Sequence, residues 1–188
     1  MSPMRALIDL DRVGTLFLHK IARAVELIEL GLSSHTIYHR CRPNGPWQRL
    51  LPGVILLSSA PPGRTERIQA ALRYAGTGAL VTGWDALALH GMKNTVCGGP
   101  VHLLVPLDKQ VRSATTVQIE RTKRLPRPTM RSGFPVTHLS RAALDTTRRI
   151  DDVDQARATL AEAVQRGTTP AALRAELGCG SNRGSALP

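Results

Sequence analysis

The chain has 188 residues and a formal net charge of +11 at pH 7, which is enough length for one or two domains with buried cores. A hydrophobic content of 42% excludes wholesale disorder, and no apolar stretch approaches the roughly 18 residues that a membrane span needs. The basic surplus favours a polyanionic partner, in the first place nucleic acid, over a surface that is basic only for solubility. Because only 3% of the residues are aromatic, a single-strand binder that stacks bases on aromatic rings is disfavoured.

The cysteines indicate a reducing compartment. Cys41, Cys97 and Cys179 are far apart in the sequence and form no CxxC pair, so we expect no disulfide framework and a cytoplasmic protein. Charged residues interrupt the apolar run near the N-terminus at positions 9–12, which argues against a signal peptide.

The first strong pattern along the chain is a pair of helices. Residues 19–32 carry apolar side chains at helical spacing, and Gly31 can end that helix by adopting a positive φ. Ser33 or Ser34 can then cap a second helix, SHTIYHRC, which ends before Pro43. Two helices joined by a short turn that contains glycine predict a helix-turn-helix.

A β-hairpin is expected directly after the second helix. Asn44-Gly45 is a tight-turn signal, and the segments WQRLL and GVILLS can pair as short strands around Pro52-Gly53. A helix-turn-helix followed by a hairpin is the arrangement of a winged helix, which we predict over residues 15–59. The second helix would supply a rod for the major groove of duplex DNA, and the hairpin a wing that lies on the phosphates.

The rest of the chain predicts a small mixed α/β domain over residues 60–178, so the predicted fold class is α+β. This part opens with a Pro-containing linker at residues 60–65, and short strands and helices follow. Residues 124–133 are interpreted as a basic loop interrupted by prolines. Residues 179–188 are expected to form a flexible tail.

Five segments spread over about residues 20–178 form a combined signature: GLSSHTIYHR…GPWQRLLPGVILL, RTERIQAALRYAG…LVTGWDALALHGM, VHLLVP, IERTKRLP and FPVTHLSRAALD. Together they resemble the AbiEi antitoxin family of bacterial type IV toxin–antitoxin systems. The resemblance implies a bacterial, cytosolic protein whose winged helix binds DNA, often at the promoter of its own operon. It also implies that the second domain neutralises a nucleotidyltransferase-type toxin, so a cognate toxin protein would be a second partner.

Base contacts are expected from the exposed side of the second helix. His39 and Arg40 can donate hydrogen bonds to guanine O6 and N7, whereas Ile37 should point inward. The alternative interpretation of Arg40 and Arg42 is a solvated helix end that complements the helix dipole. Serines at the helix start suit a phosphate, and the residues after the helix suit wing or backbone contacts. The predicted DNA-binding residues are Ser33, Ser34, His35, Thr36, His39, Arg40, Arg42, Asn44, Gln48 and Arg49.

A second basic strip is predicted later in the chain. It is interpreted either as a further surface for phosphates or an acidic partner, or as a solvated loop, and the sequence favours neither. Its residues are Arg121, Lys123, Arg124, Arg127 and Arg131.

We expect no catalytic site, no metal site and no cofactor. His35 and His39 lie one helical turn apart, but Cys41 falls on another side of the helix and no fourth ligand is evident. No GxSxG, HExxH, P-loop or GxGxxG motif occurs in the sequence. The chain therefore does not have the pattern of an enzyme.

The sequence thus predicts a DNA-binding, antitoxin-like transcriptional regulator that binds duplex DNA. One alternative is a protein-interaction module that neutralises a toxin and whose DNA binding is vestigial. The other is the remnant of a DNA-targeted nuclease without its catalytic domain, because many relatives in the resembled family continue past this region into a nuclease-like domain.

Overall fold

The computed structural model describes residues 9–179 and has the mixed α+β fold that the sequence predicts. Contacts divide the chain into two units, Met1–Thr77 and Gly78–Pro188, called unit 1 and unit 2 here and described separately. Unit 1 extends beyond the predicted boundary at residue 60, because helix α3 (Arg64–Ala75) packs on its strands. The predicted tail lies, apart from its first residue, outside the described part of the chain. No helix within that part combines the length and the hydropathy needed to cross a bilayer.

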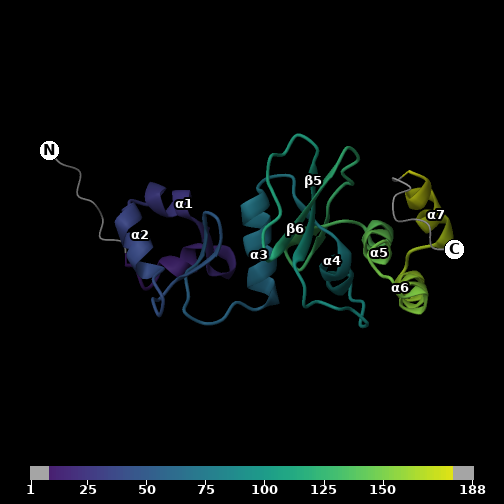
Figure 1. Ribbon diagram of the computed structural model, residues 1–188, viewed down its shortest axis with the longest axis horizontal. Coiled ribbons are helices and arrows are strands. Elements are labelled where there is room, and N and C mark those ends of the chain that lie inside the picture. Colours follow the sequence, from purple (N-terminus) through teal and green to yellow (C-terminus); the bar gives the residue numbers. More distant parts are fainter. Residues whose placement is uncertain (1–8, 180–188) are drawn as a thin grey trace. The chain divides into compact units, whose positions relative to one another are not determined.

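Unit 1 contains short helices, of which Figure 1 labels α1 and α2, and a three-stranded sheet. The strand order is β1-β3-β2, and both neighbouring pairs are antiparallel. Strands β2 and β3 form the predicted hairpin around Pro52-Gly53. In chain order, the elements before α3 are η1 (Val13–Leu16), η2 (Leu18–Lys20), β1 (Ile21–Arg23), α1 (Ala24–Glu29), α2 (Ser34–Arg40), β2 (Gln48–Leu51) and β3 (Val54–Leu56).

The helix predicted over residues 19–32 is wrong in its first part. Positive φ angles of 52° at His19 and 56° at Lys20 prevent a continuous helix from starting there. The next residues form β1, in which Ile21 is fully buried and pairs with Leu56 of β3. This pairing with a distant part of the sequence overrides the local helical spacing, so α1 covers only the second half of the predicted segment.

One apolar core holds α1, α2 and the hairpin together. Leu27 of α1, Ile37 of α2 and Trp47 before β2 belong to it, with exposed fractions of 0%, 4% and 3%. Ser33 caps α2 by accepting a hydrogen bond from the backbone N–H of Thr36 at 3.0 Å. The inward position of Ile37 and the cap at the start of α2 confirm two predictions. They also leave the opposite side of α2 at the surface.

Unit 2 contains a five-stranded sheet with the order β6-β5-β4-β8-β7. Strand β5 pairs parallel with β6 and antiparallel with β4, while β8 pairs parallel with β4 and antiparallel with β7. Helix α4 packs on β5, α5 packs on α4, and α6 and α7 both pack on α5 (Figure 1). The elements are β4 (Leu80–Val81), α4 (Gly83–Leu89), β5 (Val101–Pro106), β6 (Val117–Thr122), β7 (Thr129–Arg131), β8 (Phe134–Val136), α5 (Leu139–Thr147), α6 (Val153–Gln165) and α7 (Pro170–Gly178).

The predicted basic loop at residues 124–133 contains a strand. Its residues Thr129–Arg131 form β7, which makes a hairpin with β8. Ser132 and Gly133 close that hairpin with φ angles of 48° and 82°, a left-handed turn of the kind that joins twisted strands tightly. The prolines end before β7 begins, so they do not prevent its pairing.

A network of buried charges links α5 to β6 and α7. The side chain of Arg141 is 7% exposed, and its Nε donates a hydrogen bond to Asp145 at 2.7 Å. The same guanidinium lies 3.6 Å from Glu176 and 3.7 Å from Glu120. The hydroxyl of Thr82 donates a further hydrogen bond to Asp145 at 2.7 Å. Charges that are this deeply buried depend on one another, because none of them is well solvated by water.

Glu120 makes the stability of unit 2 dependent on pH. A hydrogen bond from His102 at 3.1 Å is the largest cause that lowers the pKa of Glu120 from 4.5 to about 2; Arg149 at 2.9 Å adds to it and burial opposes it. A carboxyl with a depressed pKa stabilises the folded state above pH 4.5, and this contribution is lost as the pH falls to about 2. We expect Glu120→Gln to lower the free energy of unfolding at pH 7 by about 1–2 kcal/mol, a value discounted for the partial exposure of the group.

Urea unfolding followed by tryptophan fluorescence measures this effect. The chain has two tryptophans, Trp47 in unit 1 and Trp84 in unit 2, so a Trp47→Phe background reports on unit 2 alone. The expected result is a flatter dependence of stability on pH in Glu120→Gln than in the parent below about pH 4.5. Identical curves for the two proteins would contradict the assigned role.

Candidate nucleic-acid interface

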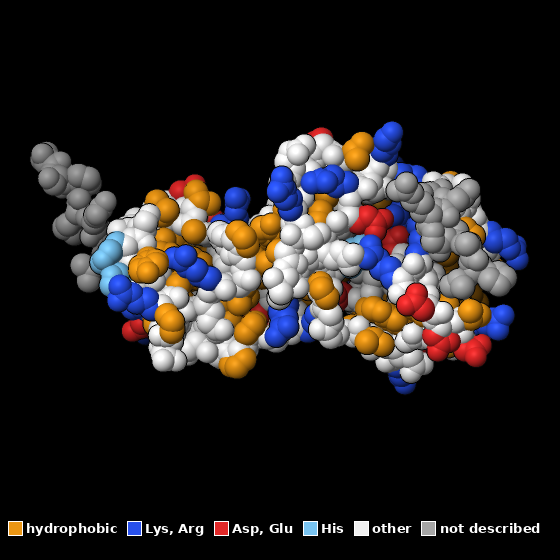
Figure 2. All heavy atoms as spheres, in the orientation of Figure 1, with side chains coloured by type: hydrophobic (Ala, Val, Ile, Leu, Met, Phe, Trp, Pro, Cys, Tyr) orange, Lys and Arg blue, Asp and Glu red, His pale blue; other side chains and the backbone are white. Residues whose placement is uncertain are grey.

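Helix α2 carries most of the predicted contact residues on the surface of unit 1. Ser33, Ser34 and His35 are exposed, and Thr36 and His39 are half-buried. Figure 2 shows histidine side chains at the end of unit 1 where Figure 1 labels α2, with Lys or Arg side chains next to them. The outward side of α2 is therefore polar and cationic.

Tyr38 forms the centre of this surface, although it is not among the predicted DNA-binding residues. Its ring is 54% exposed, and two guanidiniums lie near it, Arg42 at 5.5 Å and Arg49 at 5.4 Å from the ring centroid. These are cation–π distances. The spacing of Tyr38 and Arg42 along a helix could have indicated their contact. The contact with Arg49 could not be read locally, because that residue comes from β2.

His35 and His39 complete the surface, and their rings touch. Their Nε2 atoms lie 2.9 Å apart, and the ring centroids are separated by 4.1 Å. Desolvation, followed by the positive charges of Arg42 and His35, lowers the pKa of His39 below 6.5. Among residues 9–179 no three His, Cys, Asp or Glu side chains are grouped as metal ligands. We call His35, Tyr38, His39, Arg42 and Arg49 the α2 face.

Arg40 differs from the sequence interpretation, which assigned it to base contacts. Its side chain is 23% exposed, and its guanidinium lies over the Trp47 ring, 5.2 Å from the centroid. Nη1 donates hydrogen bonds to the carbonyl of Leu10 at 3.4 Å and to the carboxylate of Asp11 at 3.3 Å. These contacts hold Arg40 against its own unit, so its position is that of a residue that fixes the end of α2.

Replacing Arg40 tests this reassignment. We expect Arg40→Met to lower the free energy of unfolding of unit 1 by about 1–2 kcal/mol, because the contact with Trp47 and two hydrogen bonds are lost. Urea unfolding followed by Trp47 fluorescence in a Trp84→Phe background is the measurement, and Arg42→Met is the matched control with a smaller expected loss. If Arg40→Met leaves the stability unchanged but binds DNA much less tightly, the reassignment is wrong and Arg40 contacts bases.

The residues after α2 divide between structural and exposed positions. The side-chain amide of Gln48 donates hydrogen bonds to the carbonyls of Ser58 and Ala60 at 2.9 and 2.7 Å, so it ties the hairpin to the following segment instead of pointing outward. Asn44 is exposed at a φ of 63°. Close beside it, a Cβ added to Gly45 would approach the carbonyl oxygen of Arg40 to 2.4 Å, which explains the Asn-Gly sequence of this turn. An open hollow of about 700 Å³ adjoins the turn.

The second basic strip is not a continuous surface. Arg121 lies on β6 and Arg131 on β7, which are opposite edge strands of the five-stranded sheet. Arg121 donates hydrogen bonds to the carbonyls of Lys109 and Val111 at 2.7 and 3.0 Å. Arg124 forms an ion pair with Glu176. Lys123 and Arg127 remain as exposed cations on the connection between the two edge strands.

Comparisons with known proteins show a similarity in fold and none in sequence family. No family model matches the sequence, and no curated protein matches it either. The structure is similar to the crystal structure of the RV2827C protein from Mycobacterium tuberculosis, with a TM-score of 0.65 over 98% of this chain and 74% of that chain. The two sequences are 13% identical, so this similarity concerns the mixed α+β fold alone.

Proposed function

We propose that this protein is a DNA-binding, antitoxin-like transcriptional regulator of the bacterial cytoplasm, and that unit 1 is a winged helix. The observation that carries the proposal is the α2 face. In it, two guanidiniums, one from the turn after α2 and one from the neighbouring hairpin, flank one exposed tyrosine, and two histidines lie on the same side of the helix.

This face has the chemistry that duplex DNA requires. A helix of the dimensions of α2 fits the major groove, and a hairpin beside it can follow the adjoining backbone. In the proposed complex His35, Thr36 and His39 contact base edges. Arg42 and Arg49 bind phosphates, because a guanidinium forms paired hydrogen bonds with phosphate oxygens. Tyr38 keeps these two arginines in place, and Arg40 fixes the helix end.

Titration of a fluorescent duplex at several salt concentrations tests DNA binding by the full chain. Each phosphate contact contributes about −0.9 to the slope of log K against log salt concentration, so two arginine contacts and their neighbours should give a slope of about −2 to −4. A single-stranded oligonucleotide of the same sequence is the control and should bind less tightly. Equal binding of both forms, or no binding at roughly 50 mM salt, would contradict the proposal.

The antitoxin part of the proposal is supported by the resemblance of the sequence motifs to the AbiEi family. It predicts that unit 2 binds a nucleotidyltransferase-type toxin encoded by a neighbouring gene. Co-expression and co-purification of the full chain with that gene product tests this part independently of DNA binding.

A protein-interaction module without DNA binding is the second candidate function. Large apolar side chains are exposed on unit 1, and groups of such side chains often mark protein interfaces. They are Leu16, Leu18, Val25, Ile28 and Leu30. This candidate predicts that Val25→Ser/Ile28→Ser abolishes co-purification of a partner, whereas substitutions in the α2 face do not.

A further inference from the structure

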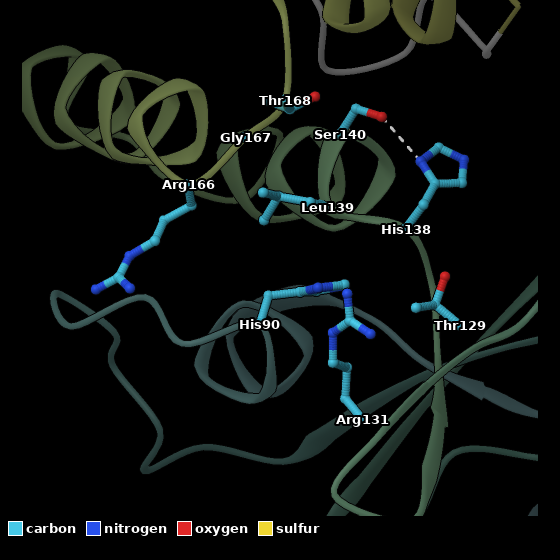
Figure 3. A pocket seen from close by; sticks show the side chains of 9 residues that line it. All are labelled: His90, Thr129, Arg131, His138, Leu139, Ser140, Arg166, Gly167 and Thr168. Atoms are coloured by element: carbon cyan, nitrogen blue, oxygen red, sulfur yellow. Dashed lines mark hydrogen bonds between the residues drawn. The ribbon is translucent and has the colours of Figure 1, made fainter.

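Unit 2 contains a hollow of about 320 Å³ that four separate segments enclose (Figure 3). His90 at the end of α4, Arg131 on β7, the first residues of α5 and the turn after α6 contribute its walls. The lining residues are His90, Thr129, Arg131, His138, Leu139, Ser140, Arg166, Gly167 and Thr168. None of them carries a carboxylate, although they include two arginines and two histidines.

The two arginines reach the hollow from different elements. Figure 3 shows the Arg131 guanidinium next to the His90 ring, with Arg166 coming from the turn on the other side of His90. Within residues 9–179 neither arginine forms an ion pair, and Arg131 Nη1 bonds only to the carbonyl of Met130 at 3.1 Å. Glu162 interacts electrostatically with Arg166. Its carboxylate also accepts hydrogen bonds from two backbone N–H groups at 2.6 and 3.3 Å. The lining itself therefore carries cationic side chains and no carboxylate, and the acids that act on it, Glu162 on Arg166 and Glu176 at 3.6 Å from His138, lie outside it.

Each histidine of the hollow uses one ring nitrogen in a hydrogen bond with the backbone. Nε2 of His90 donates to the carbonyl of Thr137 at 2.8 Å, which leaves Nδ1 as its basic nitrogen. Burial, and then the positive charges of Arg131 and His138, lowers the pKa of His90. His138 uses Nδ1 to cap α5, accepting from the N–H of Arg141 at 3.3 Å. An anion in the hollow would reverse these charge effects and favour protonation of His90.

Backbone groups add donors at the same place. Helix α5 has nine residues, and the N–H groups of its first residues, Leu139 and Ser140, have no acceptor within the helix. Both residues line the hollow. Helix-start N–H groups and guanidiniums are complementary to the same kind of ligand, an oxyanion.

We propose that this hollow binds the phosphate group of a small phosphorylated molecule, with Arg131 and Arg166 holding its oxygens and the start of α5 supplying backbone donors. Phosphate fits better than a carboxylate because donors lie on several walls of the hollow, and a phosphate offers more oxygens to them. A volume of about 320 Å³ also leaves room for an organic group beside the phosphate. Leu139 provides an apolar contact for that group.

Isothermal titration calorimetry on the full chain tests the proposal with two probes, inorganic phosphate and adenosine 5′-monophosphate, at constant ionic strength set by chloride. The test variant is Arg131→Gln/Arg166→Gln. Its matched control is Arg127→Gln/Arg174→Gln, which removes the same charge from exposed positions outside the hollow. We expect saturable binding by the parent and the control, and weakening of about 10–100-fold in the test variant.

Any of three results would overturn the proposal. The first is that neither probe binds saturably, and the second is that the test and control variants bind the probe equally tightly. The third is that chloride competes for the hollow as well as the probe does. If the test variant unfolds, the site is tested instead by the amide NMR chemical shifts of the parent protein. Addition of phosphate should change the shifts of Leu139, Ser140 and Thr168. Unchanged shifts at these residues would contradict the proposed site. Duplex DNA is added in a further arm. If DNA displaces the probe and the test variant also loses DNA affinity, the hollow is a DNA-backbone contact and not a site for a small molecule.

Discussion

Arg141→Met is expected to lower the free energy of unfolding of unit 2 by about 3–5 kcal/mol. The substitution leaves Asp145, whose side chain is 1% exposed, without the guanidinium that lies 2.7 Å from it. It also removes one of the two arginines beside Glu176. Removing one partner of a buried ion pair costs far more than the pair contributes in total. The Asp145 carboxylate, shielded from water, keeps only the hydrogen bond from Thr82 at 2.7 Å and the more distant guanidinium of Arg148 at 3.7 Å.

Urea unfolding followed by Trp84 fluorescence, in the Trp47→Phe background, measures this loss. Arg157→Met on α6 is the matched control, because Arg157 forms an exposed ion pair with Asp154 at 3.5 Å. An exposed pair of this kind contributes less than about 1 kcal/mol. A double variant, Arg141→Met/Asp145→Leu, should recover part of the loss, since it removes the buried carboxylate that has lost its main partner. Equal losses for Arg141→Met and Arg157→Met would show that the buried network does not support unit 2.

Arg42→Ala/Arg49→Ala is expected to weaken binding of duplex DNA about 100-fold at roughly 50 mM salt. Both guanidiniums lie near the Tyr38 ring, and their removal takes two phosphate contacts from the proposed complex. The slope of log K against log salt concentration should become shallower by about 1.8, from two contacts of about 0.9 each. Anisotropy titrations of parent and variant over a range of salt concentrations give both quantities.

The matched control removes two arginines from unit 2. Arg157→Ala/Arg174→Ala changes the net charge equally, and both side chains are exposed on α6 and α7. We expect this control to reduce affinity only slightly and to keep the parent's slope. If the control and the α2-face variant lose affinity to the same extent, binding depends on net charge alone and the α2 face has no special role.

Local signals predicted the parts of the fold that depend on neighbouring residues. The cap at Ser33, the inward position of Ile37 and the hairpin around Pro52-Gly53 each follow from chemistry within a few residues. Strand β1 was missed for the opposite reason. Its helical spacing is real, but pairing of Ile21 with Leu56 decides its conformation, and that pairing is visible only in three dimensions.

The candidate site shows the same division. The sequence identified most residues of the α2 face: helical spacing brings His35 and His39 to one side, and the predicted hairpin supplied Arg49. Arg40 shares that helix, yet its contacts are with Leu10, Asp11 and Trp47, and no local rule distinguishes an arginine that turns back onto its own unit from one that projects outward. The second basic strip is not continuous because the order of the strands places Arg121 and Arg131 at opposite edges of the sheet. The hollow of unit 2 is formed by four separate segments of the chain. No sequence pattern within any one of these segments indicates it.

Capture of fragmented genomic duplex DNA by the full chain, followed by sequencing, tests the central claim most directly. The parent protein should enrich a small number of fragments that share one sequence motif. A His35→Ala/His39→Ala variant should lose that enrichment while retaining weak, salt-sensitive binding through its arginines. Recovery of fragments at random by the parent, or an unchanged set of fragments with the variant, would contradict the claim that the α2 face reads duplex DNA.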